Sequence, residues 1–181
     1  MEGLTQFAFE NAPVGLAITR YRLIQTCSPS FARMFGYVPN ELAERSLAIL
    51  YPSTREFVDI GRLWLKQLSA SLQHRDSRIM QRRDGSQFWC QVHGQSTTPR
   101  DPFAHCVWSF ADLSDHRPVV RLTRREREIA MLVVQGLTNK EIGLRLDVSY
   151  RTVEAHRSRM MQKLNANNSA EMFAMLAGLP A

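Results

Sequence analysis

The 181-residue chain lacks the features of a membrane, secreted or zinc-binding protein. No apolar run approaches the roughly 20 residues that a helix needs to cross a bilayer, and the first residues, MEGLTQFAFENAP, have neither the basic start nor the apolar core of a signal peptide. Cysteine is scarce: Cys27, Cys90 and Cys106 are scattered and odd in number, which argues against a disulfide framework and a CxxC metal site. We therefore expect a cytoplasmic protein with no membrane partner and no bound metal. The cysteines are either small buried residues or include a redox-sensing thiol.

Catalytic patterns are missing as well. The chain has no Ser, His and Asp in a usable order, no phosphate-binding loop and no metal cluster with usable spacing. Its hydrophobic share of 44% and charged share of 22% are those of an ordinary globular protein, which excludes a disordered or fibrous chain. We expect a folded protein that is not an enzyme.

Positive charge is concentrated near the C-terminus. Residues 116–181 hold eleven Lys or Arg against six Asp or Glu, whereas residues 1–115 hold twelve against eleven, so the last third carries nearly all of the net charge of +6. An excess confined to one part of a chain indicates that this part meets a polyanion.

The first 115 residues contain strand and helix patterns in a fixed order: two strands, several short helices, one longer helix and three antiparallel strands. The strands are expected at residues 14–19, 22–27, 75–82, 86–96 and 105–113. Ser28 and Pro29 open the first short helix and Gly36 ends it, while Ser53–Leu72 has the apolar spacing of a long amphipathic helix. Asp84-Gly85 is a strong hairpin signal. This order predicts an α+β domain with a five-stranded antiparallel sheet and helices on one face.

Several short motifs along this region resemble a PAS sensor domain. They are FENAPVG at residues 9–15, PSF at 29–31, FGY at 35–37, EL at 41–42, RDGS at 83–86 with Trp89, and DLS at 112–114. The family often has Asn where this chain has Ser28. The resemblance implies a domain that senses a signal or ligand in its interior.

The ligand of such a domain depends on its pocket. We expect neither flavin nor haem, because Cys27 lies at a strand end rather than in a short polar helix, and Ser53–Leu72 contains no His. Alternation of apolar residues leaves two readings open: a packed core with a partner interface, or a pocket for an unidentified small apolar ligand. The candidate pocket residues are Phe35, Trp64, Phe88, Cys90, Cys106, Trp108 and Phe110.

The segment from Leu122 to Leu164 has the pattern of a helix-turn-helix. Thr123 and Glu126 form one capping box, Thr138 and Glu141 form a second, and Ser149 caps a third helix. On a helical wheel of the third helix, one line is apolar and predicted to be core, namely Val153, Met160 and Leu164. The opposite side carries small residues framed by charge, which can approach base edges in the major groove. With Lys140 of the preceding helix, the predicted DNA-binding residues are Lys140, Arg151, Thr152, Glu154, Ala155, Ser158, Arg159 and Gln162.

This segment resembles the LuxR/FixJ/GerE-type DNA-binding domain almost position for position. The matching motifs are LTRRE at residues 122–126, GLTNKEI at 136–142, VS at 148–149, RTVEAHR at 151–157 and KL at 163–164. The resemblance implies a fourth helix, Ser169–Leu176, that makes a dimer contact through Met172, Phe173, Leu176 and Leu179. One departure is Gly143, where the family usually has Ala, and helix propensity alone predicts a small destabilisation there.

Together these patterns predict two domains, an α+β PAS fold followed by an all-α four-helix LuxR-type helix-turn-helix domain. The expected bounds are residues 1–115, a linker at 116–121 and residues 122–181, with Pro118 interrupting any continuous helix. The expected function is that of a bacterial transcriptional regulator: a homodimer on a two-fold symmetric promoter site in double-stranded DNA, with RNA polymerase as a further candidate partner. The alternative is that the PAS part is only a protein–protein interaction or dimerisation module.

Overall fold

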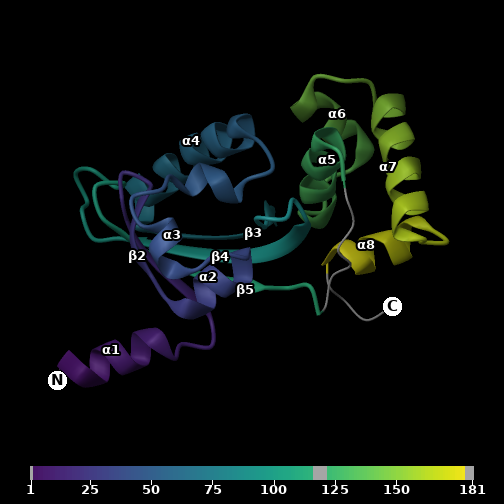
Figure 1. The fold of residues 1–181 in the computed structure, drawn as a ribbon. Helices are drawn as coiled ribbons and strands as arrows, with labels where there is room; N and C mark the ends of the chain where they lie inside the picture. The colour runs from purple at the N-terminus through teal and green to yellow at the C-terminus, as the bar shows by residue number, and fades with distance from the viewer. Residues whose placement is uncertain (1, 116–121, 178–181) are drawn as a thin grey trace. The chain divides into compact units, whose positions relative to one another are not determined.

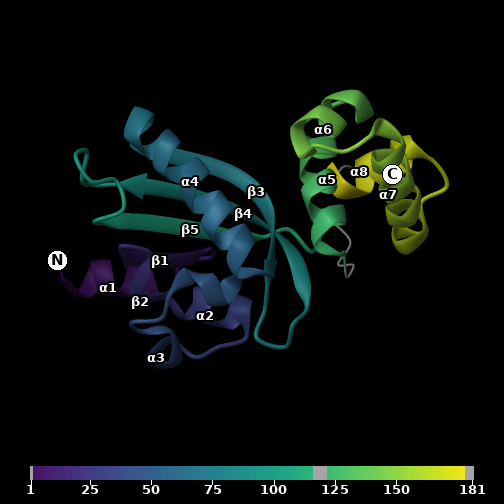
Figure 2. The ribbon, with the colours of Figure 1, turned by 90° about the horizontal axis from the view of Figure 1, so that it is seen from above.

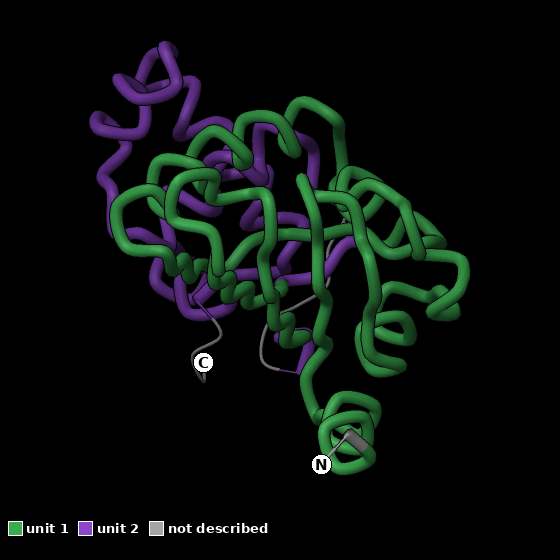
Figure 3. The backbone as a smooth tube through the Cα atoms, turned by 90° about the vertical axis from the view of Figure 1, so that its left-hand side faces the viewer, with its two compact units in different colours: residues 1–86, 90–112 green, residues 87–89, 113–181 purple. Residues whose placement is uncertain are grey.

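The computed structural model describes residues 2–115 and 122–177. The chain divides into two compact units, residues 1–86 with 90–112 and residues 87–89 with 113–181 (Figure 3). The predicted linker, residues 116–121, lies outside the described residues, and the predicted domain bounds stay a prediction. No helix among the described residues is both long enough and apolar enough to span a membrane.

A five-stranded antiparallel sheet forms the centre of the first unit (Figures 1 and 2). Its strands are β1 (Gly15–Arg20), β2 (Leu23–Cys27), β3 (Gln73–Gln81), β4 (Gln87–Ser96) and β5 (Cys106–Asp112). The order across the sheet is β2-β1-β5-β4-β3, so β1 and β5, the first and last strands in sequence, are paired in the interior of the sheet. This arrangement confirms the predicted sheet.

The hairpin between β1 and β2 turns one residue later than the sequence suggested. Tyr21 and Arg22 form the turn with φ of 50° and 65°, and Arg20 pairs with Leu23. Two left-handed residues in a two-residue loop match the twist of the flanking strands, but neither residue type signals such a turn. The consequence is that Arg22 belongs to the turn rather than to a strand.

The helices of the first unit are α1 (Glu2–Glu10), α2 (Pro29–Phe35), α3 (Pro39–Leu42), the 3-10 helix η1 (Leu47–Leu50) and α4 (Thr54–Ser71). The Ser28 hydroxyl accepts from the Phe31 amide at 3.2 Å and caps α2, as predicted. The helices α1 and η1 were not predicted from the sequence. In α4, Trp64 and Leu68 are buried, whereas Leu63 is 43% exposed, because it lies on the side of α4 that faces away from the sheet.

Aromatic packing shows that α2 and α4 cover the same face of the sheet. Phe110 on β5 contacts Phe31 of α2 with ring centroids 4.9 Å apart. Trp108, two residues earlier on the same face of β5, stacks on Trp64 of α4 at 4.5 Å. All seven candidate pocket residues are buried here, each no more than 1% exposed. The contacts between these rings are those of a packed core.

The three cysteines are free and buried. Burial raises the pKa of the Cys27 and Cys106 thiols to about 11 and raises that of Cys90 further. Because the thiolate is the reactive form, these thiols are inert at neutral pH. Of the two readings offered by the sequence, the structure favours small buried residues.

The second unit is helical: α5 (Arg124–Val134), α6 (Asn139–Leu146), α7 (Tyr150–Leu164) and α8 (Ser169–Ala177). Both predicted capping boxes are present, at Thr123 with Glu126 and at Thr138 with Glu141, and Ser149 caps α7. Gly136, with φ of 83°, follows α5 in the left-handed conformation that glycine favours. The predicted four-helix domain is confirmed.

Candidate nucleic-acid interface

The predicted DNA-reading residues lie on the exposed side of the helix-turn-helix. All eight side chains are exposed, seven of them on α7 and Lys140 in the first turn of α6. The three residues predicted to be scaffold, Val153, Met160 and Leu164, are at most 5% exposed. The helical wheel therefore separated the two sides of α7 correctly.

Two of these side chains already have partners at the N-terminal end of α7. The Thr152 hydroxyl lies 2.9 Å from that of Ser149, as part of the N-terminal cap. Arg151 donates from Nε to the Tyr150 hydroxyl at 3.4 Å, and its guanidinium lies 6.0 Å from the centre of the Tyr150 ring. Tyr150 is 45% exposed and was not among the predicted residues. An exposed aromatic ring beside an arginine is suited to hold that arginine extended toward a phosphate.

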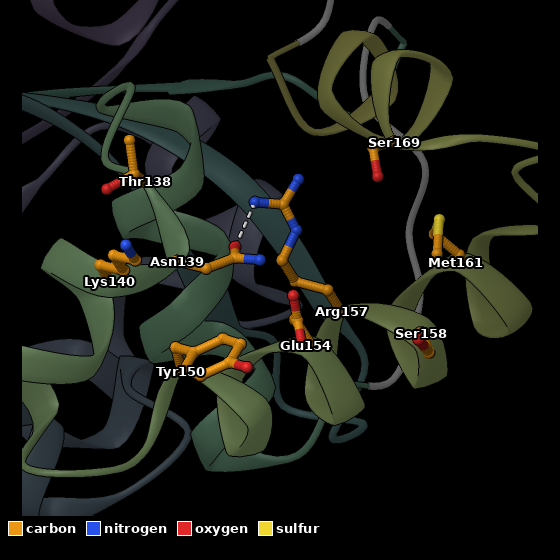
Figure 4. A pocket seen from close by; sticks show the side chains of 9 residues that line it. All are labelled: Thr138, Asn139, Lys140, Tyr150, Glu154, Arg157, Ser158, Met161 and Ser169. Atoms are coloured by element: carbon orange, nitrogen blue, oxygen red, sulfur yellow. Dashed lines mark hydrogen bonds between the residues drawn. The ribbon is translucent and has the colours of Figure 1, made fainter.

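A groove runs between the start of α6 and the exposed side of α7 (Figure 4). Its lining residues are Thr138, Asn139, Lys140, Tyr150, Glu154, Arg157, Ser158, Met161 and Ser169. Arg157 reaches across this groove and donates from Nη1 to Oδ1 of Asn139 at 2.8 Å (Figure 4). Burial lowers the pKa of Arg157, and the nearby Glu154 carboxylate opposes that shift. Asn139 and Arg157 thus connect α6 to α7.

A second set of polar contacts connects α5 to the rest of the unit. The Glu126 side chain, only 2% exposed, accepts from Lys163 Nζ and from the Thr123 amide, each at 2.6 Å. Burial by itself would raise the pKa of Glu126, but these hydrogen bonds outweigh it and lower the pKa. Arg125 donates to the Leu146 carbonyl at 2.8 Å, at the end of α6. These contacts hold α6 and α7 to α5.

The predicted dimer helix α8 is present, but two of its apolar side chains point inward. Met172 and Leu176 are fully buried where α8 packs against α5 and α7, so they belong to the core of this unit and are not an exposed seam. Phe173 is half-buried. Leu179 lies outside the described residues. Met172 and Leu176 were assigned to the dimer contact because an amphipathic pattern shows which side of a helix is apolar. It does not show whether the same chain or a second copy covers that side.

Comparison with known proteins agrees with both units. Residues 13–115 match the family described as PAS domain, and residues 120–176 match the family of bacterial regulatory proteins, luxR family. The chain therefore belongs to the PAS domain family, with a LuxR-type helix-turn-helix domain after its PAS domain. The combination predicted from the sequence is confirmed.

Individual relatives cover the chain unequally. The sensor protein TdiS of Thauera aromatica is 29% identical over 149 residues, 82% of this chain and 25% of that protein. The transcriptional regulatory protein FixJ of Rhizobium meliloti is 40% identical over 79 residues, 41% of this chain and 39% of that protein. The chain thus spans between a quarter and two fifths of the length of these curated relatives.

Solved structures extend the comparison. A PAS domain of a LuxR-family transcriptional regulator from Burkholderia thailandensis, in complex with ethanol, is 39% identical with a TM-score of 0.59, covering 60% of this chain and 96% of that one. The Vibrio cholerae VqmA dimer is 14% identical with a TM-score of 0.57, covering 98% of this chain and 90% of that one. The second likeness shows a shared fold.

Proposed function

We propose that the protein is a transcriptional regulator in which the PAS domain senses a small molecule and controls DNA binding by the helix-turn-helix. The observation that carries this proposal is the exposed side of α7, where Arg151, Glu154, Ala155, Ser158 and Arg159 lie together on a helix whose other side is core. Relatives that share this domain, including FixJ and the tetrathionate response regulatory protein TtrR of Salmonella typhimurium, are regulators by name.

The division of roles on α7 follows from side-chain chemistry. Glu154 accepts from a cytosine amino group and Ala155 contacts a thymine methyl group, so both read sequence. Lys140, Arg151 and Arg159 contact phosphates and set the register. A homodimer on a two-fold symmetric site is the arrangement in which such a motif reads two half-sites. RNA polymerase is proposed as a further partner.

Selection of bound fragments from genomic DNA, followed by fluorescence anisotropy at physiological salt, tests the proposal. Ala155→Asp places a carboxylate on the reading side and should weaken binding by more than about tenfold, because like charges across an interface repel. Ala70→Asp adds the same charge on the exposed side of α4 and is the matched control. Absence of any preferred sequence, or equal loss in both variants, contradicts the proposal.

A second candidate function is favoured by the packing of the PAS interior. Trp64 stacks on Trp108, and Phe31, Phe35 and Phe110 contact one another with centroids 4.9 to 5.9 Å apart. A core so filled suits a domain that only dimerises or binds a partner protein. Native mass spectrometry of the purified chain discriminates the two functions: a retained stoichiometric small molecule favours the sensor, and its absence favours the module.

A further inference from the structure

A cluster of polar side chains lies inside the PAS domain between the β1–β2 turn, α4 and β3. Its members are Arg22, Tyr51, Arg78 and Asp76. The first, third and fourth lie around the ring of Trp64, and Tyr51 packs on Phe57, whose ring is covered by Arg22. Tyr51 is 5% exposed and Arg78 is 1% exposed, whereas Arg22 is half-buried. The cluster is therefore closed at Arg78 and reaches solvent on the Arg22 side.

Arg22 is held in place by the backbone of α4. Its Nη2 donates to the Phe57 carbonyl at 2.9 Å, and its guanidinium lies 3.4 Å from the centre of the Phe57 ring. A Cβ on Gly61 would lie 2.1 Å from Nη1 of Arg22, so the helix has no side chain where the guanidinium sits. The Nε of Arg22 is buried without a hydrogen-bond partner among the described residues.

Arg78 is paired on one edge only. It donates from Nε to Asp76 Oδ1 at 2.8 Å, and its Nη2 also contacts the Asp76 carboxylate. The guanidinium lies 4.4 Å from the centre of the Trp64 ring. Its remaining nitrogen, Nη1, is buried with no hydrogen-bond partner in the described part of the chain.

Asp76 has no capacity left for Arg22. Besides Arg78, its carboxylate is in contact with Nε2 of His74 at 2.8 Å and accepts from Nε1 of Trp64 at 3.3 Å. Burial and the charge of Arg78 lower the pKa of His74 to about 4, so His74 is neutral at pH 7. The cluster thus holds two guanidinium groups and one carboxylate, and that carboxylate is already engaged by Arg78, His74 and Trp64.

Tyr51 lies close to both arginines without a hydrogen bond of regular geometry to either of them. Its hydroxyl is buried with no hydrogen-bond partner among residues 2–115 and 122–177, and its ring packs edge-on against Phe57 at 5.4 Å. Burial lowers the pKa of Arg22 and lowers that of Arg78 to about 10, and the Tyr51 hydroxyl opposes the shift at both arginines. Tyr51 therefore lies near both guanidinium groups.

We propose that this cluster binds the carboxylate of a small organic acid, with Arg22, Arg78 and Tyr51 donating to its oxygens. Buried donors without partners are costly, and an uncompensated buried positive charge more so, so the groups present call for an anionic acceptor. The planar fork of arginine matches the two oxygens of a carboxylate. This inference rests on the proposed sensing function, and it names an acidic ligand where the sequence left open either a packed core or a small apolar ligand.

The test uses the full chain and its intrinsic fluorescence, because all three tryptophans, at 64, 89 and 108, belong to the PAS domain. Thermal unfolding and fluorescence titration are measured with formate, acetate and benzoate, and with inorganic phosphate and benzyl alcohol as comparisons. We expect at least one carboxylate to raise the unfolding temperature and to change the Trp64 emission. No shift with any of the three carboxylates, or an equal shift with phosphate or benzyl alcohol, overturns the proposal.

Two variants tie any binding to the cluster. Tyr51→Phe removes one buried hydroxyl and should leave the fold intact. It should lower the affinity for the carboxylate by about tenfold, the value of one charge-assisted hydrogen bond. Arg22→Gln should weaken it by at least as much. Tyr37→Phe, at a tyrosine whose ring lies 5.4 Å from the Arg83 guanidinium outside the cluster, is the matched control. Undiminished binding in Tyr51→Phe and Arg22→Gln contradicts the assignment.

DNA binding is measured on the same samples with and without the carboxylate. Carboxylate binding that leaves DNA affinity unchanged supports the site and contradicts the proposed sensing function. If the protein binds DNA specifically but binds none of the carboxylates, the proposed DNA-binding function is supported and the proposed carboxylate site is overturned. The two failures are thereby distinguished.

Discussion

Arg157 on α7 donates to Asn139 at the start of α6, with 2.8 Å between Nη1 and Oδ1. This hydrogen bond spans the groove in front of the reading side and joins the two helices of the helix-turn-helix. Arg157 is half-buried and bonded to Asn139, so we infer that it is a positioning residue whose effect on DNA binding would pass through the angle between α6 and α7.

Replacing Arg157 with Met keeps the apolar stem and removes the hydrogen bond. We expect weaker binding to all DNA sequences, by about tenfold, together with a loss of about 1 kcal/mol in the stability of the second unit. Anisotropy on matched and mismatched sites, with chemical denaturation of the same samples, measures both. Asn139→Ala should produce the same pattern, and a change of preferred sequence in either variant contradicts the positioning role.

Two substitutions on the reading side should separate phosphate contact from base reading. Arg159→Ala should weaken every sequence alike and reduce the dependence of affinity on salt, because a phosphate contact releases counterions. Glu154→Ala should change which base is preferred at one position in each half-site. Binding selections at two salt concentrations measure both effects. Identical behaviour of the two variants shows that the roles are wrongly assigned.

Gly143 provides a case in which helix propensity and packing oppose each other. Propensity alone predicts that Gly143→Ala stabilises α6 by about 1 kcal/mol. However, a Cβ at this position would lie 2.8 Å from the Val148 carbonyl oxygen, which belongs to the turn before α7. We expect a net destabilisation of about 1–3 kcal/mol, as for other overpacked sites. Denaturation followed by circular dichroism checks this, with Leu144→Ala at an 86% exposed neighbour as the control.

Features encoded over a few residues were predictable from the sequence. The caps at Thr123, Thr138 and Ser149 and the Asp84-Gly85 hairpin each depend on neighbours within four positions. Features that depend on residues far away in the sequence could not be predicted in this way. Nothing near Arg22 indicates that Gly61, 39 positions later, leaves room for its guanidinium.

The same difference between local and distant partners decides which residues of the candidate site could be predicted from the sequence. The exposed side of α7 follows from helical period, so the candidate DNA-reading residues could be listed from the sequence. Arg157 lies at the border of that side, and the positioning role inferred for it depends on its contact with Asn139 on another helix. The buried arginines were missed because charge usually indicates a surface position.

Thr19 and Trp108 form a buried hydrogen bond that supports the centre of the sheet. Trp108 donates from Nε1 to the Thr19 hydroxyl at 2.8 Å, and neither side chain is exposed. Thr19→Val leaves the indole N–H unsatisfied and should destabilise the first unit by about 1–3 kcal/mol. Denaturation followed by tryptophan fluorescence measures the loss. Thr26→Val, at an exposed position on the neighbouring strand β2, should be nearly neutral.

His74 gives the first unit a defined dependence on pH. Burial and the charge of Arg78 lower its pKa from 6.5 to about 4, and its side chain is 2% exposed. Above pH 6.5 the imidazole is neutral in both states, whereas between 6.5 and 4 the unfolded chain binds a proton that the folded chain does not. Stability should therefore fall as the pH drops through this window, by as much as about 3 kcal/mol. Denaturation midpoints from tryptophan fluorescence should show a reduced slope in His74→Gln and an unchanged slope in His93→Gln at an exposed position. A slope that persists in His74→Gln would assign the dependence to other groups.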